Sequence, residues 1–403
     1  MFRNTLFAVG LIAAVVLQGQ AQAQGLTYLG QQVVATGTLF QGTTVGGLSG
    51  IDYNPATGRY LAISDDRSAI NPARYYELSL DLSKFQRSNT PGSAGVGFLA
   101  TTPILTAAGA THAANTVDPE GLRLNRATGT LYWTNEGQRT AAGFQNPTVR
   151  EMKADGSYLR DFAVPTKYQP LGSAASTVAA AGDRGIYNNL AFESLAISTD
   201  GKTLYTATEN ALTQDGPTAG LGHGSPSRIL SFDIATGAAG AEYVYQVGPV
   251  VDTPDPAGGF VTNGLTDLLA VGDRQFIGIE RSFSLGKDYE IRLYAIDARS
   301  ATDVSGLDSL EGASFTAVTK TLLLDLGDLK NDDGSALVLD NIEGITLGPV
   351  VDGRQTIVLV ADNNFAGNQF TQFVALSLVP EPATAGLWAA GLAGVFITAR
   401  RKR

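Results

Sequence analysis

The sequence predicts an all-β protein, a β-propeller, and three observations lead to this fold class. Five related hairpin patterns recur along the chain at intervals of 71 to 77 residues. Each hairpin is followed by further segments that alternate apolar and polar residues, which is the pattern of β-strands. The composition, with 47 glycines, 44% hydrophobic and 16% charged residues, is typical of a turn-rich, exported all-β protein.

The clearest hairpin spans residues 117–137. Its turn, at residues 125–129, contains the Asn and Gly that a tight bend needs. Glu120 lies where its first strand starts, and Glu136 lies where its second strand stops. Aligned on the start of the first strand, the five repeats are anchored at Ser49, Glu120, Glu193, Thr266 and Glu343, with steps of 71, 73, 73 and 77 residues. A period this regular indicates structural repeats.

A second pair of strands is predicted in the first four repeats. These pairs are 75–80 with 96–99, 149–154 with 159–164, 228–234 with 242–247, and 289–297 with 317–325. The fifth repeat offers only three strands, 344–347, 356–361 and 372–378. We expect the N-terminal segment 26–36 to supply its fourth strand and close the ring. This count favours five blades, whereas six would need a degenerate blade inside the 77-residue fourth repeat.

The two ends of the chain carry targeting signals. Residues 1–23 have the form of a signal peptide, with Arg3, an apolar run at 6–17 and Ala21-Gln22-Ala23 as the cleavage site. A membrane anchor is the alternative, but this apolar run is too short to span a bilayer. The predicted propeller domain is therefore 24–379, and a tail follows at 380–403.

The tail combines Pro380-Glu381-Pro382, an uncharged apolar run at 383–399 and a basic end at 400–403. A run of 17 residues is at the lower limit for a transmembrane helix, and the basic end would stay in the cytoplasm. The three parts resemble the PEP-CTERM sorting signal of Gram-negative bacteria. This resemblance implies transient anchoring in the inner membrane, processing by a sorting machinery, and release to the cell surface or matrix. A plain tail anchor is the alternative.

Composition also excludes several functions. The absence of cysteine rules out disulfides, zinc-thiolate sites and a cysteine nucleophile. A formal charge of −10 disfavours nucleic acid as a partner, since a phosphate backbone is bound mainly through Lys and Arg. Cations suit this charge balance better.

Strand direction brings the acids of the five hairpins together. The first two strands of a blade are antiparallel, so the start of the first and the end of the second lie on the same face. We therefore expect a ring of eight carboxylates at the mouth of the central channel: Asp65, Glu120, Glu136, Glu193, Glu209, Glu280, Glu343 and Asp362. Asp66, Asp118 and Asp267 are expected beside it. The long loops are predicted on this face and the short turns on the opposite one.

Closely spaced carboxylates raise each other's pKa and need compensation. Ca²⁺ would provide it, because it binds six to eight oxygen ligands. Arg67, Arg139 and Arg281, which follow the second-strand acids, would also provide it. Alternatively, the acids accept backbone hydrogen bonds and only hold the ring closed. A Ser-His-Asp hydrolase is a competing hypothesis that rests on His112 and His223, but a Gly-x-Ser-x-Gly motif is missing.

Short motifs recur in register with the anchors. They include Asp118-Pro119-Glu120-Gly121-Leu122, Phe192-Glu193-Ser194-Leu195 and Asn341-Ile342-Glu343-Gly344-Ile345, with Leu48-Ser49-Gly50-Ile51-Asp52 and Asn263-Gly264-Leu265. Over residues 44–377 the chain resembles the secreted "esterase-like activity of phytase" domain, related by fold to calcium-dependent β-propeller phytases. The resemblance implies a metal-lined face and hydrolysis of phosphoric or other ester bonds.

The leading hypothesis is an exported, monomeric propeller that hydrolyses an anionic ester with Ca²⁺ bound by these acids. Glu120, Glu193 and Glu343 would be ligands or bases, and Arg281 would hold the anion. Glu136, Glu209, Glu280, Asp362 and Asp65 would be further metal ligands. The alternative is a non-catalytic propeller that binds polysaccharide or protein in the cell envelope.

Overall fold

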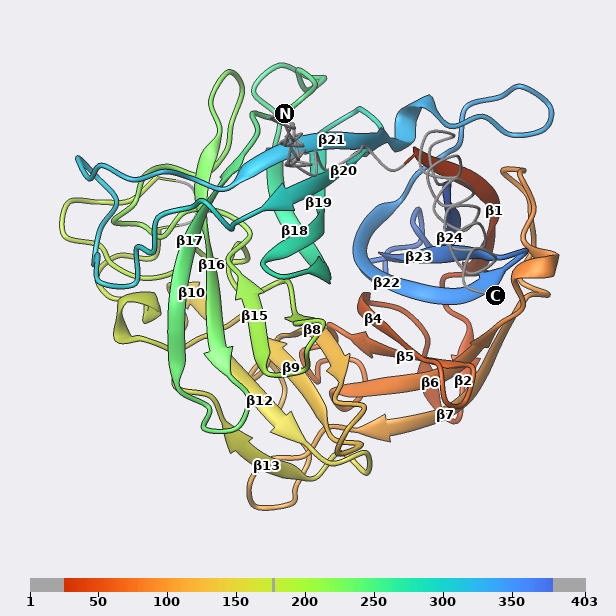
Figure 1. Ribbon diagram of the computed structural model, residues 1–403, viewed down its shortest axis with the longest axis horizontal. Helices are drawn as coiled ribbons and strands as arrows, with labels where there is room; N and C mark the ends of the chain where they lie inside the picture. The colour runs from red at the N-terminus through yellow and green to blue at the C-terminus, as the bar shows by residue number, and fades with distance from the viewer. Residues whose placement is uncertain (1–24, 176–177, 380–403) are drawn as a thin grey trace, which may run out of the picture. The chain divides into compact units, whose positions relative to one another are not determined.

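The computed structural model describes residues 25–175 and 178–379, which form one compact unit of five four-stranded antiparallel sheets (Figure 1). Blade 1 contains β4 (Leu48–Asn54), β5 (Arg59–Ser64), β6 (Arg74–Leu80) and β7 (Val96–Pro103). Blade 2 contains β8 (Pro119–Leu124), β9 (Leu131–Asn135), β12 (Thr148–Met152) and β13 (Tyr158–Asp161). Blade 3 contains β14 (Ala196–Ile197), β15 (Thr203–Ala207), β16 (Ser225–Asp233) and β17 (Ala239–Val247).

Blade 4 contains β18 (Val261–Gly272), β19 (Gln275–Ser284), β20 (Glu290–Asp297) and β21 (Thr319–Asp325). Blade 5 contains β22 (Asn341–Val351), β23 (Arg354–Asp362), β24 (Phe370–Val379) and β1 (Gly25–Ala35). The predicted five-bladed propeller is confirmed, and the described residues contain no sixth four-stranded sheet. Smaller elements are the pairs β2 (Leu39–Phe40) with β3 (Thr43–Thr44) and β10 (Gln138–Thr140) with β11 (Gly143–Gln145), and the 3-10 turns η1 (Leu82–Lys84), η2 (Thr166–Tyr168) and η3 (Leu326–Asp328).

The N-terminal strand closes the ring, as predicted. β1 pairs antiparallel with β24, from Gly25 opposite Val379 to Ala35 opposite Phe370. Gln32, fully buried on β1, also joins this strand to blade 1: its Nε2 donates to the carbonyl of Lys84 at 2.8 Å, and its Oε1 accepts from the Gly95 N–H at 2.7 Å. The N-terminal strand therefore completes the sheet of blade 5, and its Gln32 connects that blade to blade 1.

The hydrophobic core of the described residues is divided into five clusters that each lie between two neighbouring blades, and a small sixth cluster in which Val244 of blade 3 packs against Val304 and Leu310. One cluster, for example, joins Trp133 and Leu122 of blade 2 to Ile63 and Tyr75 of blade 1. The equivalent clusters lie between blades 2 and 3, 3 and 4, 4 and 5, and 5 and 1. Burying one such side chain contributes roughly 1.5–3 kcal/mol, so the contacts between blades hold the ring together.

A buried ion pair occupies the axis of the ring. Arg123 Nη2 lies 2.7 Å from Asp267 Oδ2, and both side chains are at most 5% exposed. The two groups hydrogen-bond to the backbone of all five inner segments, at Ile51, Leu122, Leu195, Leu268 and Ile345. Each of these five residues lies two positions after a repeat anchor, so one pair joins equivalent points of all the blades.

The glycine of the recurring Glu-Gly motif permits close packing at this axis. A Cβ at Gly121 would lie 3.1 Å from the Glu193 carbonyl oxygen and 2.8 Å from the Leu195 Cβ. A Cβ at Gly344 would lie 2.9 Å from the Ser49 carbonyl oxygen. The inner strand of one blade thus passes directly against the backbone of the next, and a side chain would push them apart.

Candidate active site: a buried carboxylate cluster

A local irregularity in four of the five inner strands takes the anchor residue out of the regular strand pairing. The register shifts around Ser49, Glu120, Thr266 and Glu343, so these residues have no partner in the neighbouring strand. Such bulges redirect a side chain and are frequent beside active sites. In blade 3, Glu193 precedes the two-residue strand β14, so the inner strand predicted to start at Glu193 begins three residues later.

The second strand of each blade supplies another side chain to the same place. The backbone N–H groups of Asp65, Glu136 and Glu209 donate to the residue two positions before the anchor of their own blade. In blade 5, Asp362 pairs with Asn341, which also lies two positions before its anchor. These contacts place four acids at equivalent positions, as the sequence predicted.

Blade 4 differs from the prediction, because its equivalent residue is Arg281. Arg281 pairs with Gly264, two positions before Thr266, whereas Glu280 pairs with Leu265. Successive side chains of a strand point to opposite faces, so a shift of one residue turns Glu280 away. Its carboxylate contacts Tyr245 Oη at 2.7 Å and Lys320 Nζ. The prediction that Glu280 lies in the ring of carboxylates, where it would be a metal ligand, was wrong.

Asp118, which was expected only beside the ring, lies within it. The cluster therefore contains eight acids: Asp65, Asp118, Glu120, Glu136, Glu193, Glu209, Glu343 and Asp362. All except Asp65 are between 1% and 8% exposed. One carboxylate oxygen from each of Asp118, Glu120 and Glu136 lies within 4.8 Å of the others, and the same holds for Glu136, Glu193 and Glu209.

Glu136 belongs to both of these groups, and one of its carboxylate oxygens has no hydrogen-bond donor in the described part of the chain. Its Oε1 accepts a hydrogen bond from the Ala191 N–H at 2.8 Å. Its Oε2 is buried and has no hydrogen-bond partner among the described residues. A buried carboxylate oxygen without a donor is costly, and a bound cation would remove that cost.

Two arginines contact the cluster from opposite sides. Arg67 Nη2 lies 2.5 Å from Asp118 Oδ2, and Arg281 Nη2 lies 3.1 Å from Glu209 Oε1 and 3.3 Å from Glu343 Oε1. Arg139 was expected to compensate the acids as well, but it points elsewhere. Its guanidinium donates to the carbonyls of Leu171, Ser173, Arg184 and Ile186 and pairs with Asp183.

Burial and, after it, the neighbouring carboxylates raise the pKa values of the cluster. Burial raises the pKa of Asp65 to about 8, and the charges of Asp118 and Glu343 act in the same direction. Burial raises the pKa of Glu209 to about 7, although Arg281 opposes the shift. Burial, followed by the neighbouring carboxylates, holds the pKa of Glu120 and Glu193 well above the usual range. At neutral pH the cluster therefore retains protons unless cations replace them.

Other predicted neighbours have structural contacts. Asp66 pairs with Arg74 at 2.8 Å and accepts from three backbone N–H groups of the 66–71 turn, while Asp267 lies in the axial pair. His112 packs edge-on against Trp133, and His223 Nε2 lies 3.1 Å from the Thr218 carbonyl. Among the described residues, neither histidine hydrogen-bonds to a serine or a carboxylate, which leaves the Ser-His-Asp hypothesis without support.

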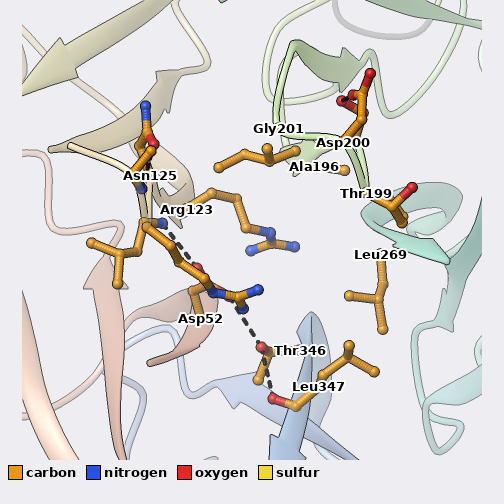
Figure 2. A pocket seen from close by; sticks show the side chains of 16 residues that line it. Asp52, Arg123, Asn125, Ala196, Thr199, Asp200, Gly201, Leu269, Thr346 and Leu347 are labelled. Atoms are coloured by element: carbon orange, nitrogen blue, oxygen red, sulfur yellow. Dashed lines mark hydrogen bonds between the residues drawn. The ribbon is translucent and has the colours of Figure 1, made fainter. Parts of the chain in front are cut away.

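A cavity of about 450 Å³ lies at the other end of the inner strands, where only short turns were predicted. Figure 2 shows Asp52, Arg123 and Thr346 around it, with Leu269 and Leu347. Its buried charges already serve the fold: Arg123 binds Asp267, and Asp52 accepts from the Leu124 N–H at 2.9 Å and the Thr346 hydroxyl at 3.2 Å. The carboxylate cluster, with its unpartnered oxygen and raised pKa values, is the stronger candidate for chemistry.

The fold and this cluster define a propeller with an acid-lined face, and comparison with known proteins gives its family. The profile of the phytase-like family, described as "esterase-like activity of phytase", matches residues 43–365. The chain therefore belongs to the phytase-like family, and the resemblance inferred from its motifs is confirmed.

Individual relatives are distant. An uncharacterized secreted protein of Arthroderma benhamiae is 26% identical over 172 residues, a match that covers 38% of this chain and 33% of that protein. A protein of unknown function from Dyadobacter fermentans shares 12% identity and a TM-score of 0.40, with 88% of this chain and 100% of that chain covered. The periplasmic gluconolactonase of Pseudomonas aeruginosa shares 12% identity and a TM-score of 0.33, with 89% and 98% covered.

No helix among the described residues is both long and apolar enough to cross a membrane. The predicted signal peptide and the tail at 380–403 lie outside those residues.

Proposed function

We propose that this protein is an exported phytase-like hydrolase that cleaves phosphoric or other ester bonds at the carboxylate cluster, with Ca²⁺ as its cofactor. The observation that carries the proposal is the charge balance of the cluster. Eight buried or partly buried carboxylates face two arginines, and the Oε2 of Glu136 lacks any donor among the described residues. Membership of the phytase-like family supports an ester as the substrate.

The donor set fits a hard cation. All its ligands are carboxylate oxygens, which Ca²⁺ prefers to nitrogen or sulfur. Asp118, Glu120 and Glu136 would hold one ion, and Glu136, Glu193 and Glu209 would hold a second. Asp65, Glu343 and Asp362 would complete the negative surroundings. Bound Ca²⁺ polarises an ester oxygen and lowers the pKa of a water molecule.

The chain's own residues would orient the anion and move the proton. Arg281 Nε is buried without a hydrogen-bond partner among the described residues, so it has a free donor for an anionic oxygen. Glu343 lies outside the two assigned ion sites, and burial raises its pKa, which favours proton uptake by a general base. Glu193 would be a ligand of the second ion or, where the ion leaves its carboxylate free, a base. We assign Arg281 to anion binding. Glu193 and Glu343 are assigned to water activation, and Glu120 is a further candidate base.

Deep burial of the cluster favours a second candidate. Glu136 and Glu209 are each 1% exposed. Such burial is expected if the bound ions only hold blades 2 and 3 together and catalyse no reaction. In that case the protein would be a non-catalytic propeller that binds polysaccharide or protein in the cell envelope.

Activity on a panel of phosphoric and carboxylic esters separates the two candidates. The hydrolase predicts Ca²⁺-dependent turnover that chelator abolishes and that Glu193→Gln reduces by about 10² or more. Glu77→Gln, in a surface pair with Arg59, is the matched control and should leave turnover unchanged. Absence of turnover across the panel, with Ca²⁺ bound and stabilising, would favour the structural alternative.

Localisation and partners follow from the two ends of the chain and are part of this proposal. We infer export by the N-terminal signal and transient inner-membrane retention by the tail, followed by processing and delivery to the cell surface, matrix or medium. The relative from Arthroderma benhamiae is described as secreted, which agrees with export. The expected partners are an anionic ester and the sorting machinery, with the propeller itself monomeric.

A further inference from the structure

The described chain begins and ends at the face of the propeller opposite the carboxylate cluster. We call this the turn face, because the inner hairpins of all five blades turn there, at residues 55–58, 125–130, 198–202, 273–274 and 352–353. Thr356 of β23 pairs with Ser377 of β24, so Val379 lies level with Arg354, directly after the turn of blade 5. Gly25 of β1 pairs with Val379. The tail at 380–403 therefore follows a strand that ends at the turn face.

Exposed valines lie next to two of these turns. Val271 of β18 is 47% exposed, and Val350 and Val351 of β22 are 63% and 36% exposed. The two turns belong to neighbouring blades, 4 and 5, and Val379 belongs to blade 5. None of the three valines is part of a core cluster of the described residues. Apolar side chains that the core does not use are available to the interface of a lipid bilayer.

Each of the five inner turns also carries one basic residue, in the turn or directly after it: Arg59, Arg126, Lys202, Arg274 and Arg354. The same turns contain three acids, Asp200, Asp273 and Asp352, and Arg59 pairs with Glu77. Five positive charges thus accompany four negative ones, although the whole chain has a formal charge of −10. The opposite face holds the eight acids of the cluster. An anionic membrane therefore repels the cluster face and does not repel the turn face.

We propose that the turn face lies against an anionic lipid bilayer while the tail anchors the protein, with Val271, Val350 and Val351 at the level of the lipid headgroups. The five basic residues would contact the headgroup phosphates. This inference rests on the anchoring by the tail that is part of the proposed function. It is independent of whether the carboxylate cluster catalyses a reaction.

The arrangement keeps the carboxylate cluster away from the membrane. Val351 lies eight positions after Glu343 on β22, which separates them by roughly 25 Å at about 3.3 Å per residue. The surface potential of a bilayer decays within a Debye length, about 8 Å at physiological ionic strength. The cluster would therefore meet its cation and its substrate in the water phase, beyond the influence of the lipid charge.

The absence of cysteine allows a direct test, since a single introduced cysteine can be labelled selectively. Full-length protein with Val350→Cys is labelled with NBD, a fluorophore whose emission rises when it leaves water, and is reconstituted into vesicles of phosphatidylcholine and phosphatidylglycerol. We expect the emission of this label to rise when vesicles are present. Leu221→Cys, 47% exposed in the loop 208–224 of the cluster face, is the matched control and should keep the emission that it has in water.

The contribution of the basic residues is measured in the same vesicles. Lys202→Gln removes an exposed positive charge from the turn face. It should lower the ratio of membrane-bound to water-exposed label about fivefold, which is the contribution of one lysine near an anionic surface. Lys287→Gln removes an exposed lysine from the cluster face and should leave the ratio unchanged. In vesicles of phosphatidylcholine alone, Lys202→Gln should have no effect.

Three results would overturn the inference. The first is equal emission of the labels at positions 350 and 221 in protein that floats with the vesicles. The second is equal emission of the turn-face label in anionic and in neutral vesicles, and the third is an equal effect of Lys202→Gln and Lys287→Gln. Protein that does not float with the vesicles would overturn the proposed anchoring as well. A protein that docks in this way but hydrolyses no ester would overturn the proposed hydrolase and leave the docking surface standing.

Discussion

At the scale of single residues, the acids of the cluster are expensive to bury and gain little from their protein neighbours. Neither Glu120 nor Glu193 forms an ion pair with a basic side chain among the described residues, and one oxygen of Glu136 has no donor. Without a cation, such groups keep protons to avoid charge, which is why burial raises their pKa values. The cluster thus costs stability in the metal-free protein, and under the proposed function a bound Ca²⁺ would restore it.

Glu136→Gln tests this directly, because Glu136 is shared by both groups of carboxylates. The amide oxygen can still accept from the Ala191 N–H, while the unpartnered charge is removed. We expect a weaker calcium affinity, by at least about tenfold, because one anionic ligand is lost. The metal-free protein should melt at the same temperature or higher at pH 8. Calorimetric titration and thermal melting measure the two effects.

The matched control is Glu77→Gln on the surface of blade 1. Its side chain pairs with Arg59, and both groups are substantially exposed. Exposed ion pairs contribute about 0–1 kcal/mol to stability, so neither the calcium affinity nor the melting temperature should change. Unchanged calcium binding in Glu136→Gln would show that the ion, if any, is held elsewhere.

The sequence identified seven of the eight acids of the cluster and misplaced one. Spacing alone suggested Glu280, 14 residues after Thr266, because an acid was expected at every second strand end. The bulge at Thr266 instead aligns Arg281 with Gly264. Bulge positions depend on cross-strand packing, so a one-residue shift of this kind is hidden in the sequence. Arg139 was misassigned for a similar reason, as its carbonyl partners lie in a loop 32 to 47 residues away.

At the scale of elements, the closing strand decides whether the ring is complete. Without β1, the strand β24 would present an open edge, which invites pairing with other chains. The sequence predicted this role for the N-terminal segment because the fifth repeat had one strand too few. It did not indicate that Gln32 would also bind the Lys84 and Gly95 backbone, since side chains that contact loops leave no periodic pattern.

Gln32→Ala should therefore destabilise the whole propeller rather than one edge. The substitution leaves the buried N–H of Gly95 and the carbonyl of Lys84 without a partner. An unsatisfied buried polar group costs about 1–3 kcal/mol, so a loss of about 3 kcal/mol is expected in urea unfolding. Thr27→Ala, at an exposed position of the same strand, should lower the free energy of unfolding by only a few tenths of the loss expected for Gln32→Ala. Equal effects of the two changes would contradict a role for the Gln32 amide.

At the scale of the molecule, the axial pair Arg123–Asp267 links equivalent points of five blades. Asp267→Ala would leave a buried guanidinium without its carboxylate, and breaking a buried pair in this way costs about 3–5 kcal/mol. Asp161→Ala, which removes the partner of the partly exposed Arg150, should cost less than about 1 kcal/mol. Chemical denaturation of both variants gives the comparison, and similar losses would contradict an axial role.

The pH dependence of the protein's stability reports on all the acids of the cluster together. Carboxylates usually make a protein more stable as pH rises, whereas these acids should make it less stable. The folded pKa values of Asp65, about 8, and Glu209, about 7, lie above the unfolded values near 4. The folded state therefore holds more protons than the unfolded state between about pH 4 and pH 8, so stability falls as pH rises through this window.

Ca²⁺ should reverse this trend, because it replaces the protons that the cluster would otherwise keep. We expect the melting temperature of the chelator-treated protein to fall from pH 5 to pH 8. With Ca²⁺ at about a hundred times its dissociation constant, stabilisation should approach 2.7 kcal/mol. It should be smallest at pH 5, where protons compete with the ion. Thermal melting at both pH values, with and without Ca²⁺, gives four measurements. A chelated protein that melts higher at pH 8 than at pH 5, or a calcium shift that is larger at pH 5, would contradict a proton-retaining cluster.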